Sequence, residues 1–442
     1  MTTPPQSDRQ GYCSVFFPRT GPLRLDDMGY LECHGLRISP GSFEGAAWAL
    51  ELGHRQWGRA TLFCMPELPL PSREVLRFTS GLCEEERDSI ASARSGLQIL
   101  VPPQTKNVLR DRKRMLRFAQ AVMGSDGLAV ADHASKLFWT ARALEDELCH
   151  DADLDITGLF VTHAVYSESD TRQNGDEHPP TRWMHTHGLA ELGALDFDIL
   201  RPNAELHGGA YDAVRALAFA IVEGEVWPGA PPYQLGNPRG GVALVRADVF
   251  QVRAAPADAA LRDHDEAHSS DRVVVCDPPA GGPLALLRGR PRPSRFLSRG
   301  INDRSVIHFT KGATELMAER ARNTYGVFRT LFGDLQHFEL PALVKLGYET
   351  DLRGGNVEHL WFQVHGVRDS IIDATLINRP YAIAGMHEGQ RAEHPAERLT
   401  DWSFMTPLGS ITPRDFRAAR AIRENPGRMA QFLATLRMMG VE

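Results

Sequence analysis

The sequence has few features of a membrane-spanning or disulfide-rich protein. A membrane helix needs about 20 mostly apolar residues, and the best apolar run here, 216–222, is far shorter. The six cysteines are scattered and form no C-x-x-C pair, which excludes a zinc ribbon or a redox dithiol. Residues 1–14 lack the apolar core of a secretory signal. We therefore expect a cytoplasmic protein with free thiols and no membrane partner.

Lysine is rare, because only five of the 49 basic residues are lysine and the other 44 are arginine. We interpret this bias as the codon usage of a high-GC bacterium; the functional alternative is forked recognition of phosphate or carboxylate groups. The formal net charge of −7 argues against a nucleic-acid partner, since dedicated nucleic-acid-binding domains are strongly basic. The basic cluster at 110–117 is expected to be a solvated helix face, because no aromatic residues interleave for base stacking.

Common catalytic and nucleotide-binding motifs are also missing. The sequence contains no G-x-x-x-x-G-K-[ST] phosphate loop, no G-x-G-x-x-G after a strand, no G-x-S-x-G nucleophile elbow and no H-E-x-x-H helix. Three alternating aspartates at 151–155 lack the glycine and the final glutamate of a calcium loop. These absences favour a binding or accessory protein over the common classes of enzyme.

Apolar patterns predict an α+β protein. We expect a mixed sheet with covering helices in an N-terminal domain (1–253) and a smaller β-rich domain with flanking helices at the C-terminus (301–442). The segment 254–300 is rich in Pro, Gly and Arg and is expected to connect the two. The local predictions used below are a helix capped by Ser42 that carries Trp48, Leu50 and Leu52, a helix over 107–123, strands over 181–187, 342–348, 359–364, 370–377 and 400–405, a helix over 310–332, and a helix that begins at Asn425.

The strongest chemical signal is the phrase W-M-H-T-H-G at 183–188. Side chains alternate along a strand, so His185 and His187 share one face and lie about 7 Å apart. Two imidazoles placed in this way can bind one metal ion, and a zinc hydrolase then needs a third ligand, an open position and a general base. Asp198 is the candidate third ligand, and His163 and His207 are further candidates. The structural alternative is that the two histidines hydrogen-bond to neighbouring backbone or carboxylates, with Trp183 in the core.

This pattern resembles the H-[ST]-H and distal Asp of JAMM-type zinc isopeptidases. The resemblance covers some 16 residues and implies zinc held by His185, His187 and Asp198. It also implies a serine three residues before the aspartate and a proline after the second histidine, where this sequence has Leu195 and Gly188. No upstream glutamate can be assigned to the family's base.

A second set of motifs lies between Ala313 and Asp415. The phrases E-H-L-W (358–361), N-R-P (378–380), Gly389 and L-T-D-W (399–402) follow one another in the order found in the YegJ-like bacterial domain of unknown function. The W-x-H-T-H-G-L phrase resembles an uncharacterised N-terminal domain sometimes joined to that domain. Neither resemblance implies an activity.

Trp361 and Trp402 can be explained in two ways. Each offers a large apolar area with one N–H to satisfy, which is typical of a core residue. The alternative is a peptide groove on a small curved sheet. Its candidate binding residues are Glu358, Trp361, Asp401 and Trp402.

Two functions remain open. The first is a non-catalytic protein-binding or accessory protein, of an immunity- or chaperone-like kind, with another protein as partner and no cofactor. The alternative is a zinc-dependent hydrolase of amide or isopeptide bonds, centred on His185, His187 and Asp198. Whether the chain is an enzyme is undecided by the sequence.

Overall fold

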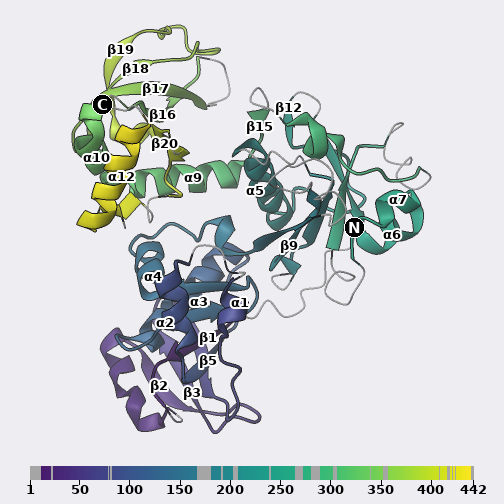
Figure 1. The fold of residues 1–442 in the computed structure, drawn as a ribbon, viewed down its shortest axis with the longest axis vertical. Helices are drawn as coiled ribbons and strands as arrows, with labels where there is room; N and C mark the ends of the chain where they lie inside the picture. Colours follow the sequence, from purple (N-terminus) through teal and green to yellow (C-terminus); the bar gives the residue numbers. More distant parts are fainter. Residues whose placement is uncertain are drawn as a thin grey trace. The chain divides into compact units, whose positions relative to one another are not determined.

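A computed structural model describes most of the chain. The described residues are 11–20, 23–77, 79, 82–166, 181–190, 193–202, 208–237, 240–263, 272–279, 289–301, 306–338, 340–351, 357–407, 409–415, 419–420, 422–423 and 425–439. The chain divides into an N-terminal unit (Met1–Cys149 with Asp153–Thr310) and a C-terminal unit (His150–Ala152 with Lys311–Glu442). Both units combine helices with sheets (Figure 1), which confirms the α+β class. No helix in the described ranges has the length and apolarity that crossing a bilayer requires.

The first sheet of the N-terminal unit is antiparallel and has the strand order β2-β3-β4-β5-β1-β6-β7. Its strands are β1 (Gly11–Phe17), β2 (Arg37–Gly41), β3 (Trp48–His54), β4 (Gly58–Cys64), β5 (Ser95–Val101), β6 (Ala129–Asp132) and β7 (Leu137–Thr140). Its helices are η1 (Leu25–His34), α1 (Arg73–Arg77), α2 (Glu84–Ala91), α3 (Val108–Met123) and α4 (Ala141–Leu148). The helix predicted over 107–123 is confirmed as α3, which packs on β1, β5 and β6. Asn107 caps α3 by accepting a hydrogen bond from the Arg110 N–H.

The helix predicted after Ser42 is wrong, because residues 43–47 form a turn and a strand begins at Trp48. Trp48, Leu50 and Leu52 lie on β3, which pairs with β2 and β4. These three residues are spaced two apart, which is the side-chain period of a strand; a helix repeats every three or four residues. Leu50 and Leu52 are buried, as expected for residues on the inward face.

The basic cluster of α3 is largely buried, so the predicted solvated face is wrong for its central residues. Arg112, Lys113 and Arg114 are only 2%, 4% and 7% exposed. Arg112 forms an ion pair with Asp132 at the end of β6. Arg114 binds Asp111 at 2.8 Å and donates to the Trp57 carbonyl oxygen. Because α3 lies against the sheet, these guanidinium groups reach acceptors distant in the sequence.

His133, which follows β6, is expected to make stability depend on pH. Its Nε2 lies 2.8 Å from the Ser14 hydroxyl and its ring stacks on Tyr12. Burial, with the nearby Lys136 and Arg112 cations, lowers the pKa of His133 to about 4. An unfolded histidine has a pKa of about 6.5, so between about pH 6.5 and about pH 4 the unfolded chain binds a proton that the folded chain excludes.

The contribution of the neutral His133 to the free energy of unfolding is therefore complete above about pH 6.5. It is lost as the pH falls toward about 4, and the loss is at most about 3 kcal/mol. Urea unfolding of the wild type and of His133→Gln at about pH 7.5 and about pH 5 measures this loss. The variant is expected to lose less than the wild type between the two conditions. Equal losses would show that His133 does not couple folding to pH.

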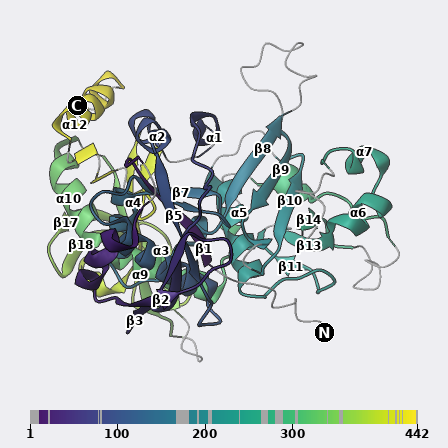
Figure 2. The ribbon, with the colours of Figure 1, turned by 90° about the horizontal axis from the view of Figure 1, so that it is seen from below.

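The second sheet of the N-terminal unit has the order β11-β13-β14-β10-β9-β8. Its strands are β8 (Val161–Tyr166), β9 (Thr181–His187), β10 (Asp196–Leu200), β11 (Tyr233–Gln234), β13 (Gly241–Arg246) and β14 (Arg272–Cys276), and a separate pair is β12 (Gly236–Asn237) with β15 (Val306–Ile307). Only the pairing of β10 with β14 is parallel among these described strands. The remaining elements are η2 (Ile156–Gly158), α5 (Gly208–Val222), α6 (Ala247–Arg253), α7 (Pro256–Ala259) and η5 (Phe296–Gly300). The sheet lies between α5 on one side and α6 with α7 on the other (Figures 1 and 2).

The segment 254–300, expected as a connector, contains the strand β14. This strand lies between β10 and β13, and Val273, Val274 and Val275 are completely buried. The second sheet therefore depends on this segment for its interior. The division between the compact units falls after Thr310.

The C-terminal unit is an antiparallel sheet with helices packed on one face. The sheet has the order β19-β18-β17-β16-β20-β21. Its elements are α9 (Lys311–Asn323), α10 (Tyr325–Leu335), η6 (Gln336–Phe338), β16 (Ala342–Glu349), β17 (Val357–Val367), β18 (Ile371–Leu376), β19 (Arg391–Pro395), η7 (Ala396–Arg398), β20 (Leu399–Thr406), β21 (Gly409–Ile411) and α12 (Pro426–Met438). The four predicted strands are confirmed as β16, β17, β18 and β20, whereas the helix predicted over 310–332 is interrupted at Thr324. Phe328 and Leu331 of α10 join alternate strand residues such as Phe362 in the core.

Candidate metal centre

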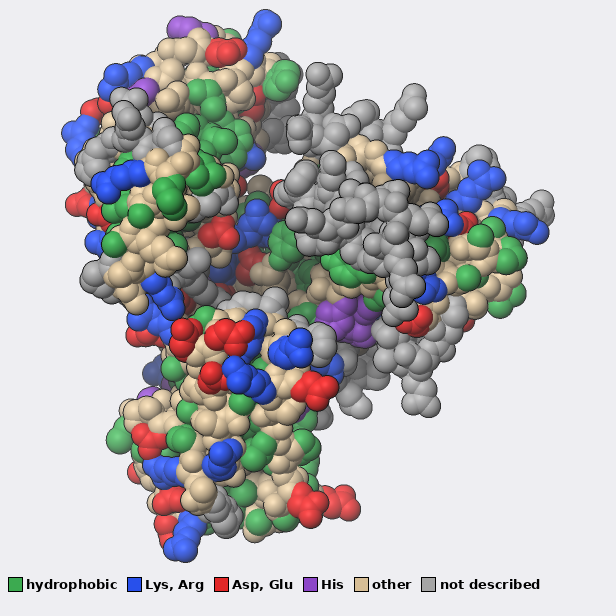
Figure 3. Space-filling view, viewed as in Figure 1, with side chains coloured by type: hydrophobic (Ala, Val, Ile, Leu, Met, Phe, Trp, Pro, Cys, Tyr) green, Lys and Arg blue, Asp and Glu red, His purple; other side chains and the backbone are tan. Residues whose placement is uncertain are grey.

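Three histidines meet on one face of the second sheet. The register of β8 against β9 places His163 directly opposite His185, and His187 lies two residues further along β9. Side chains alternate along each strand, so all three project from the same face. Histidine side chains form a patch over β9 on the face seen in Figure 3. The strand predicted over 181–187 is confirmed, and strand pairing adds His163 to the two histidines of the motif.

The three imidazoles lie close enough to share one ion. One ligand nitrogen from each ring lies within 4.8 Å of those of the other two. The ring centroids are 5.3 Å apart for His163 and His185, 5.3 Å for His163 and His187, and 4.8 Å for His185 and His187. Nitrogen ligands of a tetrahedral zinc ion, with bonds of about 2.0–2.1 Å, are roughly 3.3 Å apart. The three nitrogens would have to move closer together to reach that spacing.

Exposure differs among the three histidines. His185 is only 4% exposed, His187 is half-buried and His163, on the edge strand, is exposed. The indole of Trp183 is buried and packs on the His185 ring at a centroid distance of 4.2 Å. Packing therefore holds the inner histidine in place, while the side nearest His163 is open to water or a ligand.

Hydrogen bonds around Thr186 hold the end of β9 that carries His187. The Thr186 hydroxyl donates to the Asp196 carboxylate at 2.7 Å and accepts from the Phe197 N–H at 2.9 Å. Asp196 also accepts the N–H of Gly188 at 3.2 Å. Gly188 has a φ of +122°, and a Cβ there would lie 2.5 Å from the Leu159 carbonyl oxygen. Glycine is therefore required at the position where the JAMM pattern has proline.

Asp198, the third zinc ligand implied by the JAMM resemblance, is held by arginines. It lies opposite His185 in the pairing of β10 with β9 and is completely buried. Its Oδ2 accepts from Arg262 Nε at 2.9 Å, and its Oδ1 accepts from Arg272 Nη2 at 2.7 Å. The group of converging metal-ligand atoms found in the described chain contains His163 and does not contain Asp198.

Two further parts of the JAMM comparison can be placed in the chain. Leu195 directly precedes β10 and has no hydroxyl group for the role of the family's serine. His207 lies outside the described residues. Of the JAMM pattern, the structure thus brings together the two histidines. Sequence spacing alone gave no reason to choose His163 over Asp198 as the third metal ligand.

In the C-terminal unit, Glu358 and Trp361 tie β17 to the N-R-P turn. The Glu358 carboxylate accepts the N–H groups of Tyr381 and Ala382 at 2.8 and 2.9 Å. The backbone N–H of Trp361 donates to the Asn378 side-chain oxygen at 2.8 Å. The side chains of Glu358 and Asn378 therefore link the two segments by binding backbone N–H groups, which explains these two residues of the motifs. Lys345 Nζ lies over the half-buried Trp361 ring, 5.4 Å from its centroid.

Trp402 and Asp401 point to opposite faces of β20. Trp402 is completely buried, packs on Phe328 at a ring-centroid distance of 5.4 Å and donates its indole N–H to Thr324 Oγ1. The core explanation therefore holds for Trp402, whose side chain has no surface to offer a partner. Asp401 is half-buried, and its carboxylate accepts the backbone N–H of Trp402 at 2.9 Å.

Comparison with known proteins identifies the C-terminal domain. Residues 313–413 match the family model described as "Uncharacterized protein conserved in bacteria (DUF2314)". This is the same kind of domain as the YegJ-like domain under a different label, so the predicted resemblance is confirmed for this segment. The match extends from α9 past β21 and so covers all six strands of the sheet. No curated protein and no solved structure matches the chain significantly.

Proposed function

We propose that this chain is a zinc-binding protein whose N-terminal unit holds the ion through His163, His185 and His187. The observation that carries the proposal is the approach of three ligand nitrogens to within 4.8 Å of one another. Imidazole is a preferred zinc ligand, and sites with three histidines leave a fourth position for water or substrate. The exposed edge strand β8 gives an ion access to this position.

Hydrolysis of an amide or isopeptide bond is the second candidate for the same site. Zinc bound by three protein ligands activates water and polarises carbonyl groups. The open side next to His163 favours this activity, whereas the converging group of described residues contains no carboxylate to act as the base. Metal binding is therefore the primary proposal, and hydrolysis depends on it.

Zinc content tests the primary proposal. We expect the purified full chain, equilibrated with zinc and desalted, to retain one ion per chain by elemental analysis. His163→Ala, His185→Ala and His187→Ala are each expected to weaken zinc binding by about 100-fold or more, since even outer ligand-orienting residues contribute 10–100-fold. The matched control is His365→Ala, which removes an exposed histidine from a strand of the other unit.

Two results would contradict the zinc site. One is wild-type zinc content in all three variants, and the other is an equal loss in His365→Ala. Hydrolysis is tested on the same proteins with a chromogenic amide, before and after chelation. Activity that follows zinc content supports the second candidate, and activity unaffected by chelation or by His187→Ala rejects it.

A protein-binding role is our proposal for the C-terminal unit. On the face of its sheet opposite to the core, Gln363, His365 and Met405 are exposed and Trp361 is half-buried. Aromatic residues with a partly exposed ring are enriched in protein interfaces. An accessory protein of an immunity- or chaperone-like kind would use such a face to contact another protein.

Substitution of Trp361 tests this role. We expect Trp361→Ala to abolish retention of a partner that co-purifies with the wild type at moderate salt, since central aromatic residues commonly contribute 2 kcal/mol or more to binding, roughly 30-fold. The matched control is Trp57→Ala in the N-terminal unit. Retention that is the same for both variants would reject the sheet face as the interface.

A further inference from the structure

An arginine-rich pocket lies where β10 and β14 end. Arg201 directly follows β10 and Asp277 directly follows β14. These two strands are parallel, so their carboxyl ends meet at one edge of the sheet. The pocket has a volume of about 360 Å³, within the usual range for small-molecule sites.

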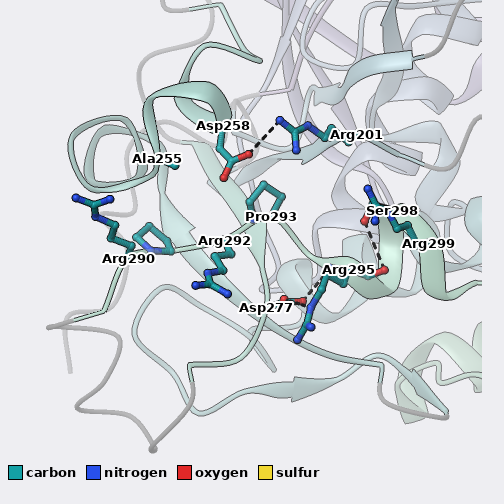
Figure 4. Close-up of a pocket in the computed structure, with 11 residues that line it drawn as sticks. Arg201, Ala255, Asp258, Asp277, Arg290, Arg292, Pro293, Arg295, Ser298 and Arg299 are labelled. Atoms are coloured by element: carbon teal, nitrogen blue, oxygen red, sulfur yellow. Dashed lines mark hydrogen bonds and ion pairs between the residues drawn. The ribbon is translucent and has the colours of Figure 1, made fainter.

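Positive charge dominates the lining. Five arginines (Arg201, Arg290, Arg292, Arg295 and Arg299) line the pocket with two carboxylates (Figure 4). Arg201 pairs with Asp258 at 3.3 Å, and Arg295 pairs with Asp277 at 2.6 Å. The other three guanidinium groups are exposed and form no ion pair with a carboxylate within the described part of the chain. Three positive charges are therefore in excess in a concave site.

The arginine segment is fastened to the sheet. The Asp277 N–H donates to the Arg292 carbonyl oxygen at 2.9 Å, and the Asp277 carboxylate accepts the Arg295 N–H at 2.8 Å. The Ser294 N–H donates to Val275 of β14. Pro291 and Pro293, whose rings restrict φ, alternate with the arginines. A ligand would thus meet a partly preorganised site, which reduces the entropy lost on binding.

Arg201 adds backbone strain at the same place. Its φ of +50° lies in the left-handed region, which residues with a side chain rarely adopt. Its N–H donates to the Arg182 carbonyl oxygen at 3.0 Å, and its guanidinium points to Asp258 in Figure 4. Such strained residues concentrate at ligand sites, where the surrounding structure holds them.

We propose that this pocket binds a small anion carrying two phosphate groups, such as a diphosphate. Guanidinium forks match phosphate oxygens in shape and charge. Each phosphate group carries about −1.5 to −2 at neutral pH, so two of them balance the excess charge. Among the described residues, none of those that line the pocket is aromatic and could stack on a base, so the diphosphate itself is the recognised part. The bias toward arginine has a functional use at this site.

This pocket is separate from the histidine cluster. Arg201 lies beside Arg182, at the start of β9, whereas His187 ends that strand. The experiment can therefore remove one site without the other. Pyrophosphate is titrated calorimetrically into the chelator-treated full chain, and Arg292→Ala and Arg299→Ala are compared with Arg59→Ala. Arg59 is an exposed arginine of β4, in the first sheet, and matches the change in charge.

We expect pyrophosphate to bind the wild type and Arg59→Ala equally and to bind each pocket variant about tenfold or more weakly, as for loss of a hydrogen bond to a charged group. His185→Ala is expected to retain wild-type affinity. A nucleoside diphosphate should bind within a few-fold of pyrophosphate, and citrate more weakly.

Four results would overturn the proposal. These are no binding of pyrophosphate, unchanged affinity in both pocket variants, loss of binding in His185→Ala, and a higher affinity for citrate. The last result would identify a carboxylate site in place of a phosphate site.

Discussion

Replacing Asp198 with alanine is expected to lower the free energy of unfolding of the N-terminal unit by about 3–5 kcal/mol. The carboxylate is completely buried and accepts hydrogen bonds from both Arg262 and Arg272, which are each 3% exposed. Its removal would leave two buried guanidinium groups side by side without the negative charge between them. Urea unfolding measured by fluorescence and circular dichroism gives the loss.

The matched control is Asp248→Ala, which breaks an ion pair between exposed side chains. Arg246 Nε lies 3.4 Å from the Asp248 carboxylate, with side-chain exposures of 51% and 63%. Pairs of this kind contribute about 0–1 kcal/mol. The folded fraction of Asp198→Asn is expected to retain zinc, because the Asp198 oxygens bind arginines. A variant of normal stability that has lost its zinc would contradict this assignment and make Asp198 a ligand.

Replacing Trp402 with alanine is expected to destabilise the C-terminal unit by about 3–5 kcal/mol. The indole is completely buried in the core formed by α10 and the sheet, where it contacts Phe328. Its N–H also donates to Thr324 Oγ1 at 3.0 Å, at the residue that separates α9 from α10. The substitution creates a large cavity and removes this hydrogen bond, and urea unfolding measures their combined effect.

Two variants separate packing from hydrogen bonding. Trp402→Phe keeps most of the apolar volume and loses the N–H, so we expect a loss of about 1–2 kcal/mol. Trp361→Ala removes a half-buried indole from the opposite face of the sheet and is expected to cost much less than Trp402→Ala. Similar losses for Trp361→Ala and Trp402→Ala would contradict the different places of the two residues in the fold.

The sequence predicted helices and strands correctly where the interactions that stabilise them come from residues close by in the chain. Asn107 and Asn425 cap α3 and α12 through N–H groups two to three residues away. The C-terminal strands β16, β18 and β20 follow from the alternation of apolar and polar residues, which reappears as alternating burial. The prediction at β3 was wrong because apolar residues spaced two apart, which is the period of a strand, were assigned to a helix.

Long-range partners could not be predicted in this way. Arg112 is buried because Asp132, twenty residues later, lies at the end of β6 beneath α3. A run of basic residues does not indicate whether a carboxylate elsewhere in the fold will pair with one of them in the core. The segment 254–300 has the composition of a connector, yet β14 is an interior strand because β10 and β13 pair on both sides of it.

The sequence by itself determined that His185 and His187 share a face, because the two-residue period of a strand is a property of the local backbone. Only the tertiary structure decided the third member of the group. Hydrogen bonding between β8 and β9 set His163 opposite His185, and the fold brought Arg262 and Arg272, 64 and 74 residues from Asp198, to the carboxylate that spacing had suggested as a ligand. Register and long-range charge pairing depend on the whole chain being folded, and no local pattern encodes them.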